Sequence, residues 1–175
     1  EVNLRFYVRR RHGDGSLRRA VVFIKELVPR YAISAVARLL YNEPYSAVPM
    51  SHEVSLDPAS GGSVVYRWRH GGLDYRLRAS VAGAARALEP DSEAEFITEH
   101  YWGYTRQRGG ATSEYRVDHP SWLVWDASEY AYECPSVTTL YGSTFDEVLR
   151  AEPRSAFVAL GSEVSVYSPV TLDGA

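Results

Sequence analysis

SVVYRWRHGGLDYRLRASVA, residues 63–82, carries the clearest fold signal of the chain. Two segments with alternating side chains flank Gly71-Gly72, and a pair of glycines supplies the positive φ angles that a two-residue hairpin turn requires. We therefore predict an antiparallel hairpin with strands over 63–70 and 73–82, one face of which is apolar and aromatic. The predicted register on that face pairs His70 with Leu73, Trp68 with Tyr75, Tyr66 with Leu77, and Val64 with Ala79.

The opposite face of this hairpin is strongly charged. It carries Arg67, Arg69, Arg76 and Arg78, with Asp74 as its only acid. Like charges at cross-strand distance repel each other. The sequence leaves two explanations open: a solvated outer face whose arginines pair with glutamates from other segments, or a site for an anion or carboxylate, which arginine binds through two parallel hydrogen bonds.

Alternating patterns and further glycine pairs extend this architecture along the chain. Strands are also predicted over 1–10, 18–28, 46–57, 96–107, 113–119, 127–133, 155–161 and 163–168. A helix is predicted from Pro29 to Pro44, a helix start at 91–95, and a short helical piece within 135–150. These elements indicate an α+β protein, mainly antiparallel β, with one or two helices and a closed or nearly closed β-barrel. We expect a single domain over 1–175.

The bulk composition excludes several functional classes. Of the 175 residues, 45% are hydrophobic and 23% are charged, which is typical of a soluble globular protein. A net charge of −3 argues against a nucleic-acid partner, and the lack of a long apolar run argues against a membrane span. Cys134 is the only cysteine, so no intrachain disulfide forms, and we expect a cytoplasmic protein.

Two histidines are expected near each other on neighbouring strands. Depending on the loop length around 109–112, His119 faces His100 or Trp102. The spacing matches no known ligand pattern, and residues 99 and 100 of one strand point to opposite faces. We therefore predict no metal and no cofactor, and expect a buried, hydrogen-bonded histidine beside tryptophan instead.

Residues 41–50, YNEPYSAVPM, combine titratable, aromatic and soft apolar side chains of the kind that line small-molecule pockets. Tyr41, Glu43 and Tyr45 are suited to a small polar ligand, and Tyr45 to general-acid chemistry on a substrate oxygen. The alternative is that both tyrosines pack with satisfied hydroxyl groups while Glu43 pairs with Arg38. Both interpretations stay open from the sequence.

Several stretches together resemble the DUF2071, or YqjF-like, family of uncharacterised bacterial proteins, grouped with the acetoacetate decarboxylase-like superfamily. The stretches are EVNLRFYV (1–8), VVFIKELVPR (21–30), ARLLYNEPYSAVPM (37–50), FITEHYWGYT (96–105), VDHPSWLVWDA (117–127) and VYSPV (166–170). The resemblance implies a β-rich, barrel-like fold with an internal cavity. Members usually carry an additional N-terminal portion, so we expect an upstream segment to be missing before Glu1.

The catalytic motif of the decarboxylases is only partly matched. That motif resembles Gly-Arg-Glu-x-x-Gly-x-Pro-Lys-Lys, and the similar run here spans 37–46. Arg38 and Pro44 match, whereas Tyr45 and Ser46 stand where the family places its lysines. A phenol cannot form an imine, so the electron sink of decarboxylation is lost. The decarboxylases also use a glutamate in an early strand, for which Glu1 is the best positional counterpart.

Three functions follow as hypotheses. The first is a protein that binds, or acts on, a small oxo or carboxylate compound without an imine. Its catalytic candidates are Tyr45, Glu43 and Glu1, and its ligand-binding candidates are Arg5, Arg38, Tyr41, Tyr45, Met50, His119 and Trp122. The second is a non-catalytic scaffold or homo-oligomeric interaction module, because tyrosine and arginine are frequent at interfaces. The third is imine chemistry at Lys25, the only lysine.

Overall fold

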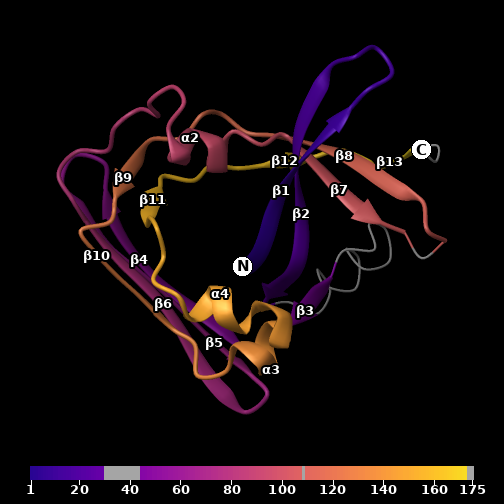
Figure 1. The fold of residues 1–175 in the computed structure, drawn as a ribbon. Helices are drawn as coiled ribbons and strands as arrows, with labels where there is room; N and C mark the ends of the chain where they lie inside the picture. Colours follow the sequence, from indigo (N-terminus) through magenta and orange to yellow (C-terminus); the bar gives the residue numbers. More distant parts are fainter. Residues whose placement is uncertain (30–43, 108, 173–175) are drawn as a thin grey trace. The chain divides into compact units, whose positions relative to one another are not determined.

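The computed structural model describes residues 1–29, 44–107 and 109–172. The chain divides into two compact units, each assembled from separate stretches of sequence (Figure 1). Unit 1 comprises 1–47, 96–121 and 162–175, and unit 2 comprises 48–95 and 122–161. The expectation of a single domain stays a prediction.

Unit 1 is built on a mixed sheet of seven strands. Its order is β1 (Val2–Arg11), β2 (Leu17–Val28), β7 (Trp102–Arg106), β8 (Thr112–Asp118) and β12 (Ser165–Val166). β3 (Tyr45–Ala47) runs parallel to β2, and β13 (Val170–Leu172) pairs with β8 in antiparallel orientation. The alternating patterns predicted over 1–10 and 18–28 form the β1–β2 hairpin, and β2 buries Ala20, Leu27 and Val28 in the core.

Unit 2 contains a second, antiparallel sheet. Its order is β10 (Glu129–Glu133), β6 (Leu73–Ala82), β5 (Gly61–His70) and β4 (Met50–Asp57). The predicted β5–β6 register is confirmed at all four pairs of the apolar face. A two-stranded sheet of β9 (Val124–Asp126) and β11 (Phe157–Ala159) completes the strands of this unit.

Three short helical segments follow one another in unit 2: α3 (Val137–Tyr141), the 3-10 helix η1 (Ser143–Phe145) and α4 (Asp146–Arg150). Ser136 caps α3, since its hydroxyl accepts a hydrogen bond from the Thr139 amide at 3.1 Å. The Tyr75 hydroxyl donates to the Ser136 carbonyl oxygen at 3.1 Å and ties the cap to β6. The predicted helical piece within 135–150 is thereby confirmed.

The arginine face of the β5–β6 hairpin is explained by acids on flanking strands. Glu53 of β4 accepts a hydrogen bond from Arg67 at 2.7 Å, and Glu133 of β10 binds Arg76 through two hydrogen bonds. Arg69 lies 3.7 Å from Asp74 across the turn. The first explanation given by the sequence, a solvated face with glutamate partners, is therefore confirmed for Arg67 and Arg76.

Two predictions about the fold are wrong. The closed or nearly closed barrel is not found: the strands of the described residues form separate, open sheets. The strand predicted over 96–107 is instead the C-terminal part of α2 (Glu93–Thr98), a short connection and β7. The helix start predicted at 91–95 is correct, and Ser92 accepts a hydrogen bond from the Glu95 amide. The helix predicted from Pro29 to Pro44 lies outside the described residues, except for its two end prolines.

Candidate functional site

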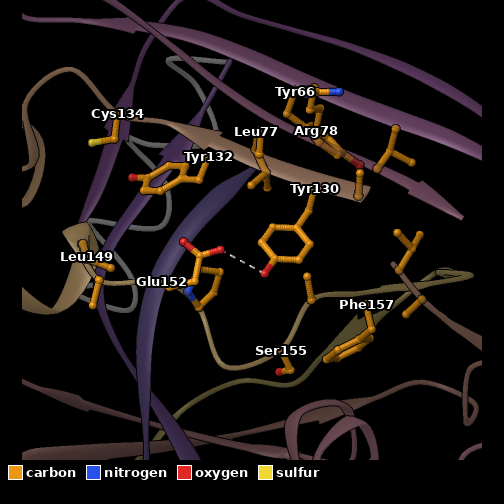
Figure 2. A pocket seen from close by; sticks show the side chains of 18 of the residues that line it. Tyr66, Leu77, Arg78, Tyr130, Tyr132, Cys134, Leu149, Glu152, Ser155 and Phe157 are labelled. Atoms are coloured by element: carbon orange, nitrogen blue, oxygen red, sulfur yellow. Dashed lines mark hydrogen bonds between the residues drawn. The ribbon is translucent and has the colours of Figure 1, made fainter. Parts of the chain in front are cut away.

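A large cavity of about 1250 Å³ lies within unit 2. One wall is the apolar face of the four-stranded sheet, and the other is formed by residues 148–161, which run from α4 through irregular backbone to β11. Drug-sized ligands occupy pockets of about 300–1,000 Å³, so the volume is sufficient for a small molecule. Figure 2 shows side chains from both walls directed into the same space.

The sheet wall of the cavity is apolar because alternate residues of its strands share one face. It comprises Val54, Leu56, Val64, Tyr66, Leu77, Ala79, Tyr130 and Tyr132. Three of these side chains are unusually exposed for apolar residues: Val54 at 51%, Leu77 at 39% and Tyr130 at 40%. Exposed apolar surface inside a concave region is typical of a binding site.

Few polar groups interrupt this lining. The Tyr130 hydroxyl donates to a carboxylate oxygen of Glu152 at 3.4 Å, which is long for an O–H···O bond (Figure 2). Burial raises the pKa of Tyr132, with further contributions from Cys134 and Tyr141 beside it. Burial likewise raises the pKa of Tyr141 to about 12. These phenols therefore stay protonated at neutral pH and act as hydrogen-bond donors.

Comparison with known proteins gives one result. The model of the family DUF2071, described as an uncharacterized conserved protein, matches residues 1–164. The chain belongs to the DUF2071 family. No curated protein and no solved structure matches this DUF2071 chain. The family predicted from the sequence is thus confirmed, whereas its grouping with the decarboxylase-like superfamily stays a prediction.

The predicted site residues of the DUF2071 chain do not form one described site. Arg38, Tyr41 and Glu43 lie outside the described residues. Glu1 is exposed and accepts a hydrogen bond from Asn3 at 3.2 Å, while Arg5 donates to the Ile97 carbonyl oxygen at 3.2 Å. Tyr45 is half-buried on β3, on the opposite side of β2 from the strand β1 that carries Arg5.

The remaining candidates lie at strand ends. Met50 begins β4 and lines a second hollow of about 630 Å³ together with Trp68 and three arginines. Trp122 is half-buried just before β9. The expected pairing of His119 with His100 or Trp102 is wrong, because the β7–β8 register places Trp102 opposite Arg116. The His119 ring instead packs 4.9 Å from the ring of Tyr101, centre to centre.

Lys25 and Glu26 lie side by side in β2. The structure buries Glu26, whose exposed fraction is 1%. Glu26 is opposite Tyr45 in the parallel β2–β3 register. Partial burial lowers the pKa of Lys25, which increases the fraction of neutral amine at a given pH. A neutral amine is the form that imine chemistry at Lys25 requires, and imine formation itself stays a prediction.

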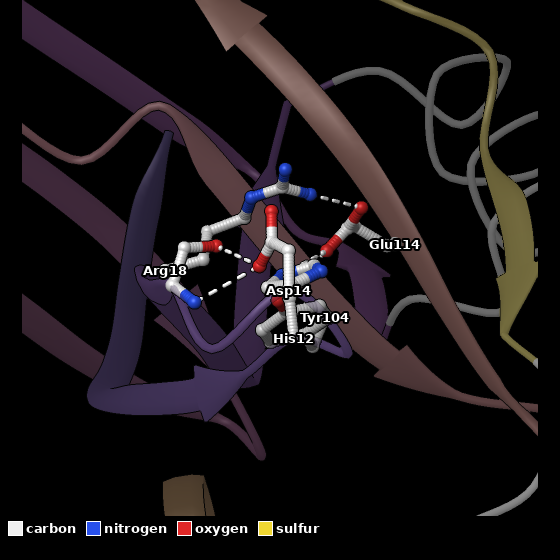
Figure 3. Close-up of polar contacts among 6 residues, drawn as sticks. His12, Asp14, Arg18, Tyr104 and Glu114 are labelled. Atoms are coloured by element: carbon white, nitrogen blue, oxygen red, sulfur yellow. Dashed lines mark hydrogen bonds and ion pairs between the residues drawn. The ribbon is translucent and has the colours of Figure 1, made fainter.

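A cluster of titratable side chains in unit 1 surrounds Glu114, which is 8% exposed (Figure 3). Its carboxylate accepts hydrogen bonds from Arg18 at 2.5 Å and from the Tyr104 hydroxyl at 2.7 Å, and it lies 3.8 Å from Nε2 of His12. The Arg18 guanidinium also stacks 3.7 Å over the ring of Trp102. Burial, and the hydrogen bond to Glu114, raise the pKa of Tyr104 to about 12. The hydrogen bonds of Arg18 and Tyr104 to Glu114 join β2, β7 and β8, so the role of this network in the fold is structural.

His100 is buried, with an exposed fraction of 7%, which confirms the expected burial of a histidine here. Its ring packs against Tyr7 and Phe96 at centroid distances of 4.6 and 5.1 Å. Within the described part of the chain, neither ring nitrogen has a hydrogen-bond partner of normal geometry, contrary to the prediction. The described residues also contain no group of three or more His, Cys, Asp or Glu side chains arranged to hold a metal ion.

The stability of unit 1 is expected to fall as the pH drops below about 6.5, the ordinary pKa of histidine. Burial, followed by the charges of Arg19 and Arg5, lowers the pKa of His100 in the folded state. Between that lowered value and 6.5 the unfolded chain binds more protons, so protonation favours unfolding in this window. Urea unfolding at pH 7.5 and 5.5 tests this, and His100→Phe should reduce the difference. His52→Phe, which removes an exposed histidine in unit 2, should leave this difference between the two pH values unchanged. If His100→Phe and the parent chain lose the same free energy of unfolding between pH 7.5 and 5.5, His100 is not the group responsible.

The sequence did not identify the wall formed by residues 148–161. The sequence pattern of this wall is weak, because Glu152, Pro153 and Ser155 belong to no helix or strand. Only a strand over 127–133 was predicted there; Tyr130 and Tyr132 lie two residues apart on β10, and their shared face lines the cavity. Among the described residues, none of the helices has the length and apolar character needed to traverse a lipid bilayer.

Proposed function

We propose that this DUF2071 protein binds a small, mainly apolar molecule carrying an oxo or carboxylate group in the cavity of unit 2. The supporting observation is the cavity itself: about 1250 Å³ between an apolar sheet face and residues 148–161. Burial of apolar ligand surface against Val54, Leu77 and Phe157 supplies the affinity, at roughly 25 cal/mol per Å² of surface removed from water.

The polar groups of the cavity favour a ligand that accepts hydrogen bonds. Tyr66 and Tyr130 are donors on the sheet wall. The hydrogen bond from Tyr130 to Glu152 is long, so the phenol can turn to a ligand oxygen at little cost. Of the two polar groups proposed for the ligand, an oxo group suits the position beside Tyr130 better than a carboxylate, because the Glu152 carboxylate repels a second carboxylate.

Fluorescence of the neutral apolar dye N-phenyl-1-naphthylamine tests the proposal, with 2-decanone and decanoate as competitors. We expect saturable dye binding, displacement by both competitors, and tighter binding of the ketone. Val54→Glu should weaken dye binding at least about tenfold, because it places a charge in an apolar site. Ser55→Glu is the matched control: it adds the same charge one residue further along β4, on the opposite face, and both positions are exposed.

Tyr130→Phe separates the polar from the apolar contribution. It should leave dye binding intact and weaken 2-decanone several-fold, as expected for one lost hydrogen bond of about 1 kcal/mol. Equal loss of dye binding in Val54→Glu and Ser55→Glu, or no saturable binding at all, would refute a site in this cavity. The scaffold function stays a prediction, and borohydride reduction of the ketone mixture followed by intact-mass measurement reports any imine at Lys25.

A further inference from the structure

One face of the β1–β2 hairpin in unit 1 carries a row of arginines that the proposed cavity does not involve. Arg5, Arg9 and Arg11 alternate along β1, and the register places Arg19 of β2 directly opposite Arg9. We call these four side chains the arginine row. Arg9, Arg11 and Arg19 are exposed, and Arg5 is half-buried. At about 3.3 Å per residue, the row extends roughly 20 Å along the strand.

No carboxylate of the described residues neutralises this row. In the ranges that the structure describes, none of its four arginines forms an ion pair. Arg5 and Arg11 donate only to carbonyl oxygens, of Ile97 and Gly15, and Arg19 lies 5.8 Å above the ring of Phe96. Like charges directly opposite each other, as in Arg9 and Arg19, destabilise a hairpin.

Several other arginines of the described residues do have carboxylate partners. On the opposite face of the same hairpin, Arg18 pairs with Glu114, and on the β5–β6 hairpin Arg67 and Arg76 pair with Glu53 and Glu133. The positive field of the row is also felt inside unit 1, where Arg19 and Arg5 both lower the pKa of His100. Among the described residues, the row therefore places four arginines on one face without a carboxylate partner.

The positive charge is also concentrated in one part of the sequence. Residues 1–28 contain seven of the 19 lysines and arginines of the chain but only three of its 22 acids, whereas the whole chain has a net charge of −3. A basic patch on an acidic protein attracts anionic partners to one place and repels them elsewhere. β1 is also the terminal strand of the described sheet, with β2 as its paired neighbour there.

We propose that the arginine row binds an acidic protein segment in extended conformation, added along β1. An extended peptide pairs with a terminal strand through main-chain hydrogen bonds and presents every second side chain to one face. Carboxylates at alternate positions would therefore meet Arg5, Arg9, Arg11 and Arg19. A second copy of β1 does not fit, because its own arginines would face these.

Fluorescence anisotropy with two labelled peptides of about 12 residues tests the proposal. One alternates threonine and glutamate, and the other has the same composition in Glu-Glu-Thr-Thr blocks, so that only half of its carboxylates share a face. We expect the alternating peptide to bind several-fold more tightly, and its affinity to fall between about 50 and 200 mM NaCl as charges are screened. Equal affinity of the two peptides would overturn the extended geometry.

Paired variants locate the surface. Arg9→Gln with Arg19→Gln should weaken the alternating peptide about tenfold or more, since hydrogen bonds to charged groups are the strong ones. Arg67→Gln with Arg69→Gln removes the same charge from the unit 2 hairpin and should change the affinity less than about twofold. Equal loss in both variants would overturn the proposal in favour of net charge alone. Tighter binding of a thymidine oligonucleotide of similar length would overturn it in favour of a nucleic-acid surface.

Discussion

Replacing Gly62 by alanine is expected to lower the stability of unit 2 by about 3 kcal/mol, by combining overpacking with backbone strain. Gly62 lies in the central strand β5 between Leu56 and Val81, with φ at +143°. A Cβ atom there would lie 1.9 Å from the carbonyl oxygen of Ser55. Because the obstacle is backbone of the neighbouring strand, it cannot rotate away, and the sheet that carries the cavity must distort.

Gly72→Ala provides the control for Gly62→Ala. Gly72 also has a positive φ, of +78°, but nothing lies within 4 Å of its would-be Cβ atom. Only the left-handed conformation is penalised there, which costs about 1–2 kcal/mol. Urea unfolding followed by tryptophan fluorescence compares the two variants in the full chain. Similar free energies of unfolding would show that the contact with Ser55 relaxes freely, contrary to the prediction.

Arg18→Met is expected to destabilise unit 1 by about 3 kcal/mol, the range observed when one partner of a buried ion pair is removed. The variant leaves the Glu114 carboxylate, whose side chain is 9% exposed, with the Tyr104 hydroxyl and distant His12. It also removes the guanidinium from the ring of Trp102. The measurement is the free energy of unfolding in urea at pH 7.5.

An exposed ion pair serves as the reference for Arg18→Met. Arg76 binds Glu133 with side chains that are 42% and 50% exposed, so Arg76→Met should cost less than about 1 kcal/mol. A second comparison is internal: adding Glu114→Gln to Arg18→Met removes the unpaired charge and should recover part of the lost stability. Equal costs for Arg18→Met and Arg76→Met, or no recovery in the double variant, would refute the account of the buried cluster.

Local signals in the sequence predicted the hairpins well, because turn chemistry and alternation act within a few residues. Gly71-Gly72 sets the whole β5–β6 register, and the alternation over 1–10 and 18–28 gives β1 and β2. The prediction of a strand over 96–107 was wrong because it also relied on local preference alone. Phe96 and Ile97 are good strand formers, but Ser92 caps a helix whose Phe96 packs on Tyr7 and His100. The tertiary contacts override the intrinsic preference.

Closure of the sheets and the position of the cavity depend on contacts between distant segments. No pattern in the sequence states that residues 148–161 face the side chains of Leu77 and Tyr130, and the barrel was inferred from the hairpins and from the family resemblance. Tyr45 was chosen for its place in a motif, and the structure puts it beside Glu26 rather than in the unit 2 cavity. Chemical suitability can be recognised in a sequence, whereas co-location of its parts requires the fold.

The interleaved path of the chain has a consequence for synthesis on the ribosome. All of unit 2 precedes residue 162, whereas the sheet of unit 1 is completed only when β12 and β13 pair with β8. During translation the outer edge of β8 is therefore left without these partners while unit 2 already has its full complement of strands. A nascent chain halted just after residue 161 should present this bare edge, which makes it the stage most vulnerable to aggregation.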